Sequence, residues 1–453
     1  MHVRSVKDME RPNAWKNYNK TELKKVEETA KEYRAFIDAG KTERECAEET
    51  VAALEKAGYI SLEKAVAGKK KLKAGDKVYV NRMGKAVLIF LLGKKPLAEG
   101  MNIVGAHIDS PRLDLKQNPL YEDGDFALAD THYYGGIKKY QWVARALALH
   151  GVVVKKDGTT VRITIGEKDT DPVVGVSDLL PHLAQDQMSK KMSEAITGED
   201  LDIILGGKPL KDEYGIEEED LISAEIEAVP AGKSRDFGLD RSMIIGYGHD
   251  DRVCAFAELK AVLELTGIPA YTCCGMLVDK EEIGSVGATG MRSNYLENAV
   301  AEILELQGAY SELNVRRALR NSRMLSCDVS AGFDPMYAGA FEKKNAAWLG
   351  RGVCFNKFTG SRGKSGSNDA NAEYMAKLRR IMDENKVCWQ TAELGKVDQG
   401  GGGTIAYICA LYGMEVIDSG VAVLNMHAPM EIISKADLYE SVKAYKAFMQ
   451  KAV

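Results

Sequence analysis

The sequence of 453 residues has no long apolar run, no extended basic stripe and no C-x-x-C pair of cysteines. No stretch approaches the roughly eighteen apolar residues that a membrane helix needs, and the N-terminal segment lacks the apolar core of a signal peptide. The 61 Lys and Arg residues are scattered among 66 Asp and Glu residues, which leaves no basic stripe for the phosphates of nucleic acid. We therefore expect a cytoplasmic protein that binds neither membranes nor nucleic acid.

The eight cysteines lie mostly within apolar segments such as YTCCGMLV (271–278) and AYICALYG (406–413). This placement predicts buried free thiols instead of disulfides or a zinc ribbon, which needs closely paired cysteines. Hydrophobic residues make up 45% of the chain, which is enough for sizeable cores, and the length suggests two or three domains.

Two regions with α/β periodicity flank a region with a different hydrophobic pattern. Helical periodicity covers 22–39, 42–57, 252–265, 369–383 and the segment from 434, and strand-like apolar runs cover 77–82, 85–93, 102–106, 270–278, 323–327 and 420–424. Residues 113–245 instead contain alternating segments such as HGVVVKK and TTVRITIGE, which indicate hairpins. The sequence therefore predicts a discontinuous α/β catalytic domain (1–112 and 246–453) with a mixed central sheet, interrupted by a β-rich inserted domain (113–245).

Histidines and acidic residues follow several of the apolar runs of the α/β regions. His107 follows NIVGA, Glu281 and Glu282 follow GMLVDK, Asp328 follows RMLSC, and His427 follows VAVLNM. In open α/β sheets ligands bind beyond the carboxyl ends of the strands, so these side chains are expected to meet. This set of residues is typical of a site for two divalent metal ions.

Two divalent ions about 3.5 to 4 Å apart need a carboxylate that bridges them. Asp250, at the front edge of a predicted helix, is expected to be that bridge. His107 and Asp328 would complete one ion, and Glu282 and His427 would complete the other. Each ion then keeps an open position for water or substrate, as a catalytic zinc does. Mixed nitrogen and oxygen ligands suit zinc first, with cobalt or manganese as alternatives.

Two further acidic residues are assigned to the chemistry. Glu281, adjacent to a ligand, is expected to be the general base that takes a proton from the metal-bound water and delivers it to the leaving amine. Asp109 lies two residues after His107 and is expected to hydrogen-bond its other ring nitrogen, which fixes the tautomer.

Each signal taken alone has an ordinary structural explanation. A His-x-Asp sequence is usually structural, a Glu pair is usually a solvated helix face, and the pair Asp250-Asp251 before a helix is usually an N-cap. His427 alone is more often a loop histidine than a ligand. The occurrence of all of them in order, at successive strand ends, favours the metal site.

The chain resembles the aspartyl aminopeptidase and vacuolar aminopeptidase I family of dinuclear metallopeptidases. The similarity rests on motifs that span nearly the whole chain: GAHIDSPRLDLK (105–116), YYGGIKKYQWVARALALHGVV (133–153), DLLPHLAQD (178–186), GHDDRVCAFAEL (248–259), VDKEEIGSVGATG (278–290), SCDVSAGFDP (326–335), DQGGGGTIA (398–406) and VLNMHAPMEI (423–432).

This resemblance implies the same catalytic base, Glu281, and the same five metal ligands: His107, Asp250, Glu282, Asp328 and His427. It further implies that the middle region is a dimerisation domain and that dimers assemble into a tetrahedral dodecamer whose active sites face an interior chamber. His182, in PHLAQD, matches a family histidine that reaches the active site of a neighbouring subunit.

The sequence departs from the family at the substrate pocket. Relatives specialised for acidic N-terminal residues have further histidines around the fourth ligand motif, where this chain has Ala331 and Asp334. An acidic substrate side chain needs a cationic partner, and Lys357 is a candidate for that role. The preference for acidic or neutral N-terminal residues therefore stays open at this point.

Three other segments have competing interpretations. The segment TGSRGKSGS (359–367) is not a phosphate loop, because Phe358 stands where the first glycine is required. The run 400–403 either lets backbone N–H groups such as that of Gly402 approach the substrate or forms a tight turn before a helix. Tyr134, Trp142 and Arg145 are interpreted first as packing of the inserted domain and second as an oligomer contact.

These observations together predict an aminopeptidase that releases the N-terminal residue, acidic or neutral, of peptides. The expected cofactor is two divalent ions per subunit, and the expected assembly is a homo-oligomer. An amidohydrolase acting on non-peptide amides uses the same chemistry and stays an alternative, since only the response to a blocked α-amine separates the two. A catalytically silent oligomeric cage is the non-enzymatic alternative.

Overall fold

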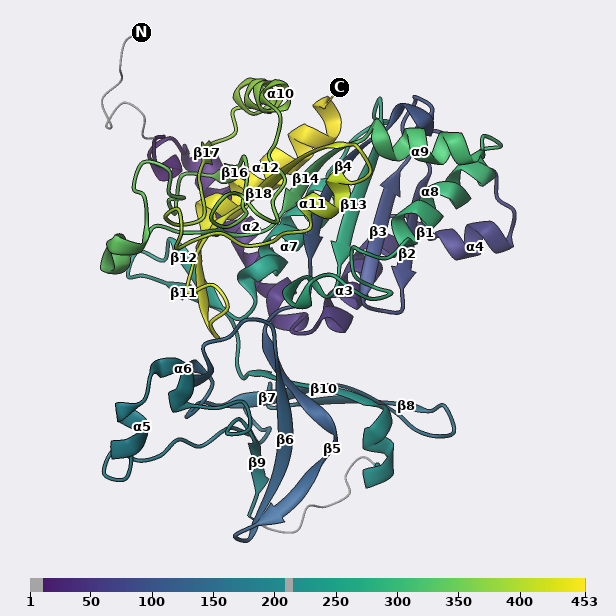
Figure 1. Cartoon of the computed structure of the whole chain (residues 1–453). Coiled ribbons are helices and arrows are strands. Elements are labelled where there is room, and N and C mark those ends of the chain that lie inside the picture. The colour runs from purple at the N-terminus through teal and green to yellow at the C-terminus, as the bar shows by residue number, and fades with distance from the viewer. Residues whose placement is uncertain (1–10, 208–214, 453) are drawn as a thin grey trace.

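The computed structural model describes residues 11–207 and 215–452. The chain forms a larger α/β body and a smaller β-rich body joined through a narrow connection (Figure 1). Among the described residues, every helix is too short or too polar to cross a lipid bilayer.

The larger body is built on a nine-stranded sheet. Its order is β1 (Ile60–Ser61), β2 (Lys77–Arg82), β3 (Ala86–Leu91), β13 (Thr272–Val278), β4 (Met101–His107), β14 (Arg323–Cys327), β18 (Glu415–Gly420), β16 (Val353–Asn356) and β17 (Trp389–Thr391). Strands β13, β4, β14 and β18 are parallel neighbours, whereas β3 and β16 flank them antiparallel. The sheet is therefore mixed, as predicted.

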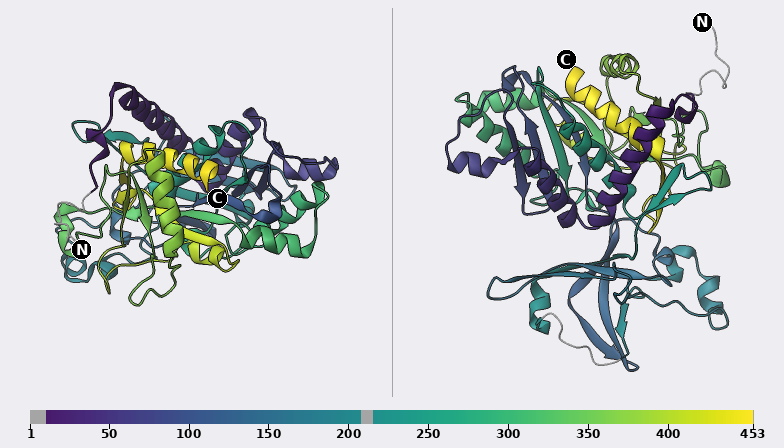
Figure 2. Two further views of the ribbon diagram at one scale, coloured as in Figure 1. Left: turned by 90° about the horizontal axis from the view of Figure 1, so that it is seen from above. Right: turned by 180° about the vertical axis from the view of Figure 1, so that it is seen from behind.

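Helices cover both faces of this sheet. One face packs against α2 (Lys20–Ala39), α3 (Glu43–Lys56), α7 (His249–Leu263), α10 (Ala372–Glu384) and α12 (Lys435–Lys451), and the other against α4 (Leu62–Ala67), α8 (Tyr295–Leu306), α9 (Glu312–Arg320) and α11 (Ala406–Ala410). Figure 2 shows α2 and α12 side by side on the first face. Burial on both faces explains why the central strands are continuous apolar runs in the sequence.

Short 3₁₀ helices connect the main elements. They are η1 (Ala14–Lys16), η2 (Leu97–Glu99), η3 (Lys139–Gln141), η4 (Glu218–Ser223), η5 (Glu281–Ile283) and η6 (Pro335–Ala340). Of these, η5 contains the Glu pair.

A five-stranded sheet lies at the side of the larger body. Its order is β11 (Arg235–Phe237), β12 (Met243–Gly246), β20 (Glu431–Ser434), β19 (Ala422–Leu424) and β15 (Ser330–Ala331). The single strand predicted over 420–424 is thus divided, because the chain leaves the large sheet at Gly420 and enters this one at Ala422. At Gly420 a Cβ atom would lie 1.9 Å from the Asp328 carbonyl oxygen, so only glycine allows the strands to approach there.

The smaller body is a six-stranded antiparallel sheet with two short helices. The order is β8 (Thr160–Ile165), β7 (Leu147–Val154), β10 (Ala224–Pro230), β5 (Arg112–Asp123), β6 (Phe126–Tyr134) and β9 (Ile203–Gly206), and the helices are α5 (Gln185–Ser189) and α6 (Met192–Ala195). Trp142 is fully buried in its core with Leu113 and Leu147, in agreement with the packing role expected of it. All eight cysteines are free, and seven of them are buried.

Candidate metal centre

Three of the five proposed ligands follow the carboxyl ends of neighbouring parallel strands, and the other two come from a helix and a turn beside them. His107 is the last residue of β4, Asp328 directly follows β14, and Glu282 lies in η5 just after β13. Asp250 lies in the first turn of α7, and His427 lies in the turn between β19 and β20. The structure brings all five side chains together.

Asp250 lies between the two imidazoles. Its Oδ1 is 3.2 Å from His107 Nε2, and its Oδ2 is 3.3 Å from His427 Nε2. On the two sides of this carboxylate, Asp328 Oδ1 is 4.0 Å from His107 Nε2 and Glu282 Oε2 is 3.6 Å from His427 Nε2. One carboxylate oxygen thus faces each histidine, which is the arrangement a bridging ligand requires.

Three groups of side chains in this region have ligand atoms within 4.8 Å of one another. They are His107 with Asp250 and Glu282, His107 with Glu281 and Asp328, and Asp250 with Asp251 and Asp328. Glu282 Oε1 is buried and has no hydrogen-bond partner, as is expected of a carboxylate oxygen that binds a cation. The donor set of imidazole nitrogens and carboxylate oxygens therefore fits divalent metal ions.

Backbone carbonyls orient both histidine rings. The Nδ1 of His107 lies 3.0 Å from the Asp109 carbonyl oxygen, with the Asp109 carboxylate at 3.3 Å, and the Nδ1 of His427 lies 2.9 Å from the Gly136 carbonyl oxygen. Each Nδ1–H donates to its carbonyl, so Nε2 is the ring atom that faces Asp250 and that would bind a metal ion.

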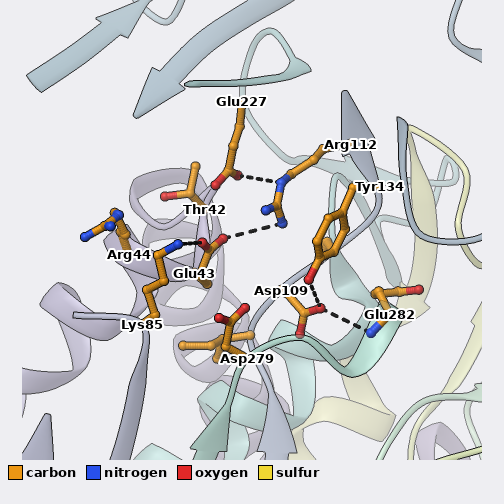
Figure 3. A network of polar contacts seen from close by, with 12 residues as sticks. Thr42, Glu43, Arg44, Lys85, Asp109, Arg112, Tyr134, Glu227, Asp279 and Glu282 are labelled. Carbon is orange, nitrogen blue, oxygen red and sulfur yellow. Dashed lines mark hydrogen bonds and ion pairs between the residues drawn. The ribbon is translucent and has the colours of Figure 1, made fainter. Parts of the chain in front are cut away.

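The Asp109 carboxylate has a second set of contacts with the Glu pair. Its Oδ1 accepts the backbone N–H of Glu281 at 3.1 Å, and its Oδ2 accepts that of Glu282 at 3.2 Å. Tyr134 Oη also donates to Oδ2, at 2.9 Å (Figure 3). Asp109 therefore holds the turn η5 as well as the ring of His107.

Two residues of the site were missed by the sequence analysis. Glu431 is buried, and its carboxylate accepts the backbone N–H of Asp250 at 2.9 Å and that of His427 at 2.8 Å, so one side chain fixes two ligands. It lies in the motif VLNMHAPMEI, four residues after His427, and this position in the motif could have indicated it. Tyr134 was interpreted as packing of the inserted domain, but its hydroxyl reaches Asp109.

The crowding of carboxylates raises several pKa values. Burial raises the pKa of Glu281 to about 7, opposed by His107 and supported by Asp109 and Asp250. Burial and Asp250 raise the pKa of Asp328 well above its usual range. Burial also acts on Asp250, but hydrogen bonds with both histidines bring its pKa below the usual range. Buried like charges at this density are costly unless cations compensate them.

A cavity of about 500 Å³ opens over the ligands. Its lining includes Gly402, Thr404 and Asp418 beside the metal-ligand candidates. Asp418 is buried at the wall, where its Oδ1 accepts the Thr404 hydroxyl at 2.5 Å and its Oδ2 has no partner. Burial raises the pKa of Asp418 to about 7.

Two of the proposed substrate residues do not line this cavity. Lys357 is half-exposed and forms an ion pair with Asp369, and it is absent from the cavity lining. His182 is exposed in the smaller body, in the segment before α5, and is likewise absent from the lining. Within one chain, only Gly402 of the three substrate candidates lies at the cavity.

An α/β fold with histidines and carboxylates gathered at the carboxyl ends of parallel strands, beneath an open cavity, defines a metal-dependent hydrolase. The sequence profile of the family described as aminopeptidase I zinc metalloprotease (M18) matches residues 36–449. A probable M18 family aminopeptidase 1 from Clostridium acetobutylicum is 59% identical over 454 residues, covering 96% of this chain and 97% of that protein.

Solved structures agree with this match. An aminopeptidase of the M18 family from Thermotoga maritima superposes with a TM-score of 0.92 at 45% identity, covering 98% of this chain and 99% of that one. Aminopeptidase I from Clostridium acetobutylicum superposes with a TM-score of 0.91 at 54% identity, covering 99% and 100%. The chain therefore belongs to the aminopeptidase I zinc metalloprotease family, M18, and is a metallo-aminopeptidase. The resemblance inferred from the motifs is confirmed.

Proposed function

We propose that the enzyme uses two divalent ions, with Asp250 as the bridge and Glu281 as the general base. The observation that supports this best is the position of Asp250, which presents one carboxylate oxygen to each of the two imidazoles. His107 and Asp328 would hold one ion, and Glu282 and His427 the other. Zinc is the proposed metal, in keeping with the family description.

When bound, the two ions polarise the scissile carbonyl and lower the pKa of the attacking water. Glu281 lines the cavity, and its backbone is fixed by Asp109, so its carboxylate faces the place where the reacting groups meet. It accepts the proton of the water and then donates it to the amine of the departing peptide. A blocked α-amine should abolish turnover, since an aminopeptidase must recognise the free terminus.

We propose that neutral N-terminal residues are preferred over acidic ones. The wall of the cavity contains the buried carboxylate of Asp418, and no Lys or Arg lies among the described lining residues. An acidic substrate side chain would lie near this carboxylate without a cationic partner. Apolar lining residues such as Leu394 and Met426 suit a neutral side chain.

A panel of aminoacyl-nitroanilides tests both the activity and this preference. Leu-nitroanilide should be hydrolysed with zinc present, whereas N-acetyl-Leu-nitroanilide should not. The value of kcat/KM for the Asp and Glu substrates should be lower by about ten-fold or more, as roughly 1.4 kcal/mol of repulsion gives. Asp418→Asn should reduce this difference in kcat/KM between neutral and acidic substrates. Asp398 is exposed and lies outside the cavity lining, so Asp398→Asn should leave the difference unchanged. Turnover of the acetylated substrate at the rate of the free one would favour the amidohydrolase alternative.

We also propose that the chain forms a homo-oligomer in which the smaller body, which makes up most of the inserted domain predicted over 113–245, is the dimerisation domain; the last part of that range, β11 and β12, lies in the five-stranded sheet of the larger body. Exposed apolar side chains gather in the segment around His182: Leu179, Leu180, Leu183, Met188 and Met192. Exposed apolar residues in such number are typical of a contact surface. The Saccharomyces cerevisiae mApe1, which shares the fold at 21% identity and a TM-score of 0.75, is a dodecamer. We propose a dodecamer here too, in which His182 reaches the active site of a neighbouring chain.

Light scattering coupled to gel filtration tests the assembly. The native protein should elute with the mass of twelve chains, and Leu183→Glu should lower that mass, because the leucine is 67% exposed within the apolar segment. Leu239→Glu changes a fully exposed leucine between β11 and β12, in the five-stranded sheet of the larger body, and should have no effect. A native protein that stays monomeric at micromolar concentration contradicts the proposal.

We also propose that the protein is cytoplasmic. The eight free thiols support this location, because disulfides are rare in the cytosol.

A further inference from the structure

A chain of contacts joins the sheet of the smaller body to the turn that contains Glu281 and Glu282 (Figure 3). We propose that Tyr134 and Arg112 are positioning residues of the reaction, which hold Asp109 and through it the backbone of the general base. The inference rests on the proposed role of Glu281. It assigns to the smaller body a function in catalysis within its own chain, beyond any part in assembly.

In the active site, the Asp109 carboxylate binds the backbone of two consecutive residues of η5. Each of its oxygens accepts one backbone N–H, from Glu281 and from Glu282. Asp109 is completely buried, so its remaining hydrogen-bonding capacity has to be met by protein groups. Tyr134 supplies the donor, and loss of its hydroxyl would leave Oδ2 with the Glu282 N–H alone. The direction of the carboxylate therefore depends on Tyr134.

Arg112 in turn fixes the ring of Tyr134. The two residues face each other in the register of β5 and β6, and the guanidinium carbon of Arg112 lies 3.8 Å from the centre of the ring. A guanidinium stacked on an aromatic face is a planar and directional contact, which an ammonium group does not reproduce. The stacking sets the plane of the ring and hence the direction of its hydroxyl.

Carboxylates from both bodies hold the guanidinium. Arg112 Nε lies 2.8 Å from Asp114 Oδ1 and 3.2 Å from Glu227 Oε2, both in the sheet of the smaller body. Its Nη1 lies 3.5 Å from Oε2 of Glu43, the first residue of α3 in the larger body, and the other oxygen of Glu43 lies 3.4 Å from Lys85 Nζ. Arg112 is thus buried at the junction of the two bodies. Through Arg112 and Tyr134, the position of the smaller body sets the position of the Asp109 carboxylate.

The test uses the full-length zinc enzyme with Tyr134→Phe, Arg112→Lys and the double variant. Tyr134→Phe removes the hydroxyl but keeps the ring, and kcat should fall about ten- to a hundred-fold, as for loss of a hydrogen bond to a charged group. KM should stay within about two-fold, because the substrate is not contacted. Arg112→Lys keeps the charge between the carboxylates and should lower kcat in the same way. Tyr133→Phe, on the opposite face of the same strand, is the matched control and should behave as wild type.

The double variant separates positioning from independent structural effects. If Arg112 acts through Tyr134, the double variant should be no more than about two-fold slower than Tyr134→Phe alone. Zinc content and thermal midpoint should match the wild type in Tyr134→Phe, which excludes a loss of metal or of fold.

Three outcomes overturn the inference. They are an unchanged kcat in Tyr134→Phe, a loss explained by missing zinc, or losses that multiply in the double variant. If the wild type is active and the kcat of Tyr134→Phe is unchanged, the positioning role is rejected and the proposed function stands. A wild type without aminopeptidase activity in zinc rejects the proposed function instead.

Discussion

Replacement of Glu281 by Gln is expected to lower kcat by about 10²- to 10⁴-fold, the usual contribution of a general base. The amide has the size of the carboxylate but cannot accept the proton of water. Because Asp109 holds Glu281 through its backbone N–H, the turn should stay in place in the variant. Zinc content should therefore equal that of the wild type, measured by elemental analysis alongside single-turnover hydrolysis of Leu-nitroanilide.

The competing assignment of Glu281 as a metal ligand gives a different result. Its carboxylate belongs to one of the groups whose ligand atoms lie close together, with His107 and Asp328. If it were a ligand, Glu281→Gln would lose zinc together with activity, as Glu282→Gln is expected to do. A variant that keeps zinc and wild-type kcat would instead remove Glu281 from the mechanism.

The sequence predicted the fold, and it predicted which side chains meet at the candidate metal centre, because both depend on local patterns. Central strands that are buried on both faces produce continuous apolar runs, and parallel strands place the residues that follow them at one edge. His107 and Asp328 lie at that edge for this reason. The divided strand around Gly420 was not predictable, because the change of sheet depends on a close approach to Asp328 that no local pattern records.

The supporting residues depend on contacts that are distant in sequence. Tyr134 meets Asp109 only because β5 and β6 form a hairpin whose register places the tyrosine opposite Arg112. Glu431 reaches Asp250 across 181 residues of sequence. Spacing along one sequence records none of these contacts.

Replacement of Asp250 by Asn should cost both metal and activity. Asn has a single carbonyl oxygen and no charge, so it cannot serve both ions or offset their repulsion. We expect kcat/KM to fall by more than about 10³-fold, because several kcal/mol of transition-state stabilisation depend on the ions. The ratio of zinc to protein should fall from two toward one or less, measured after dialysis against zinc-free buffer.

Asp251→Asn is the matched control for this variant. Asp251 is adjacent, completely buried and close to Asp250 and Asp328, so it is the rival ligand. Burial raises the pKa of Asp251 above its usual range, and Asn keeps the size of the side chain. No histidine ion pair involves Asp251 in the described chain, in contrast to Asp250. Asp251→Asn should thus keep its zinc, and a loss of zinc in Asp251→Asn with retention in Asp250→Asn would transfer the bridging role to Asp251.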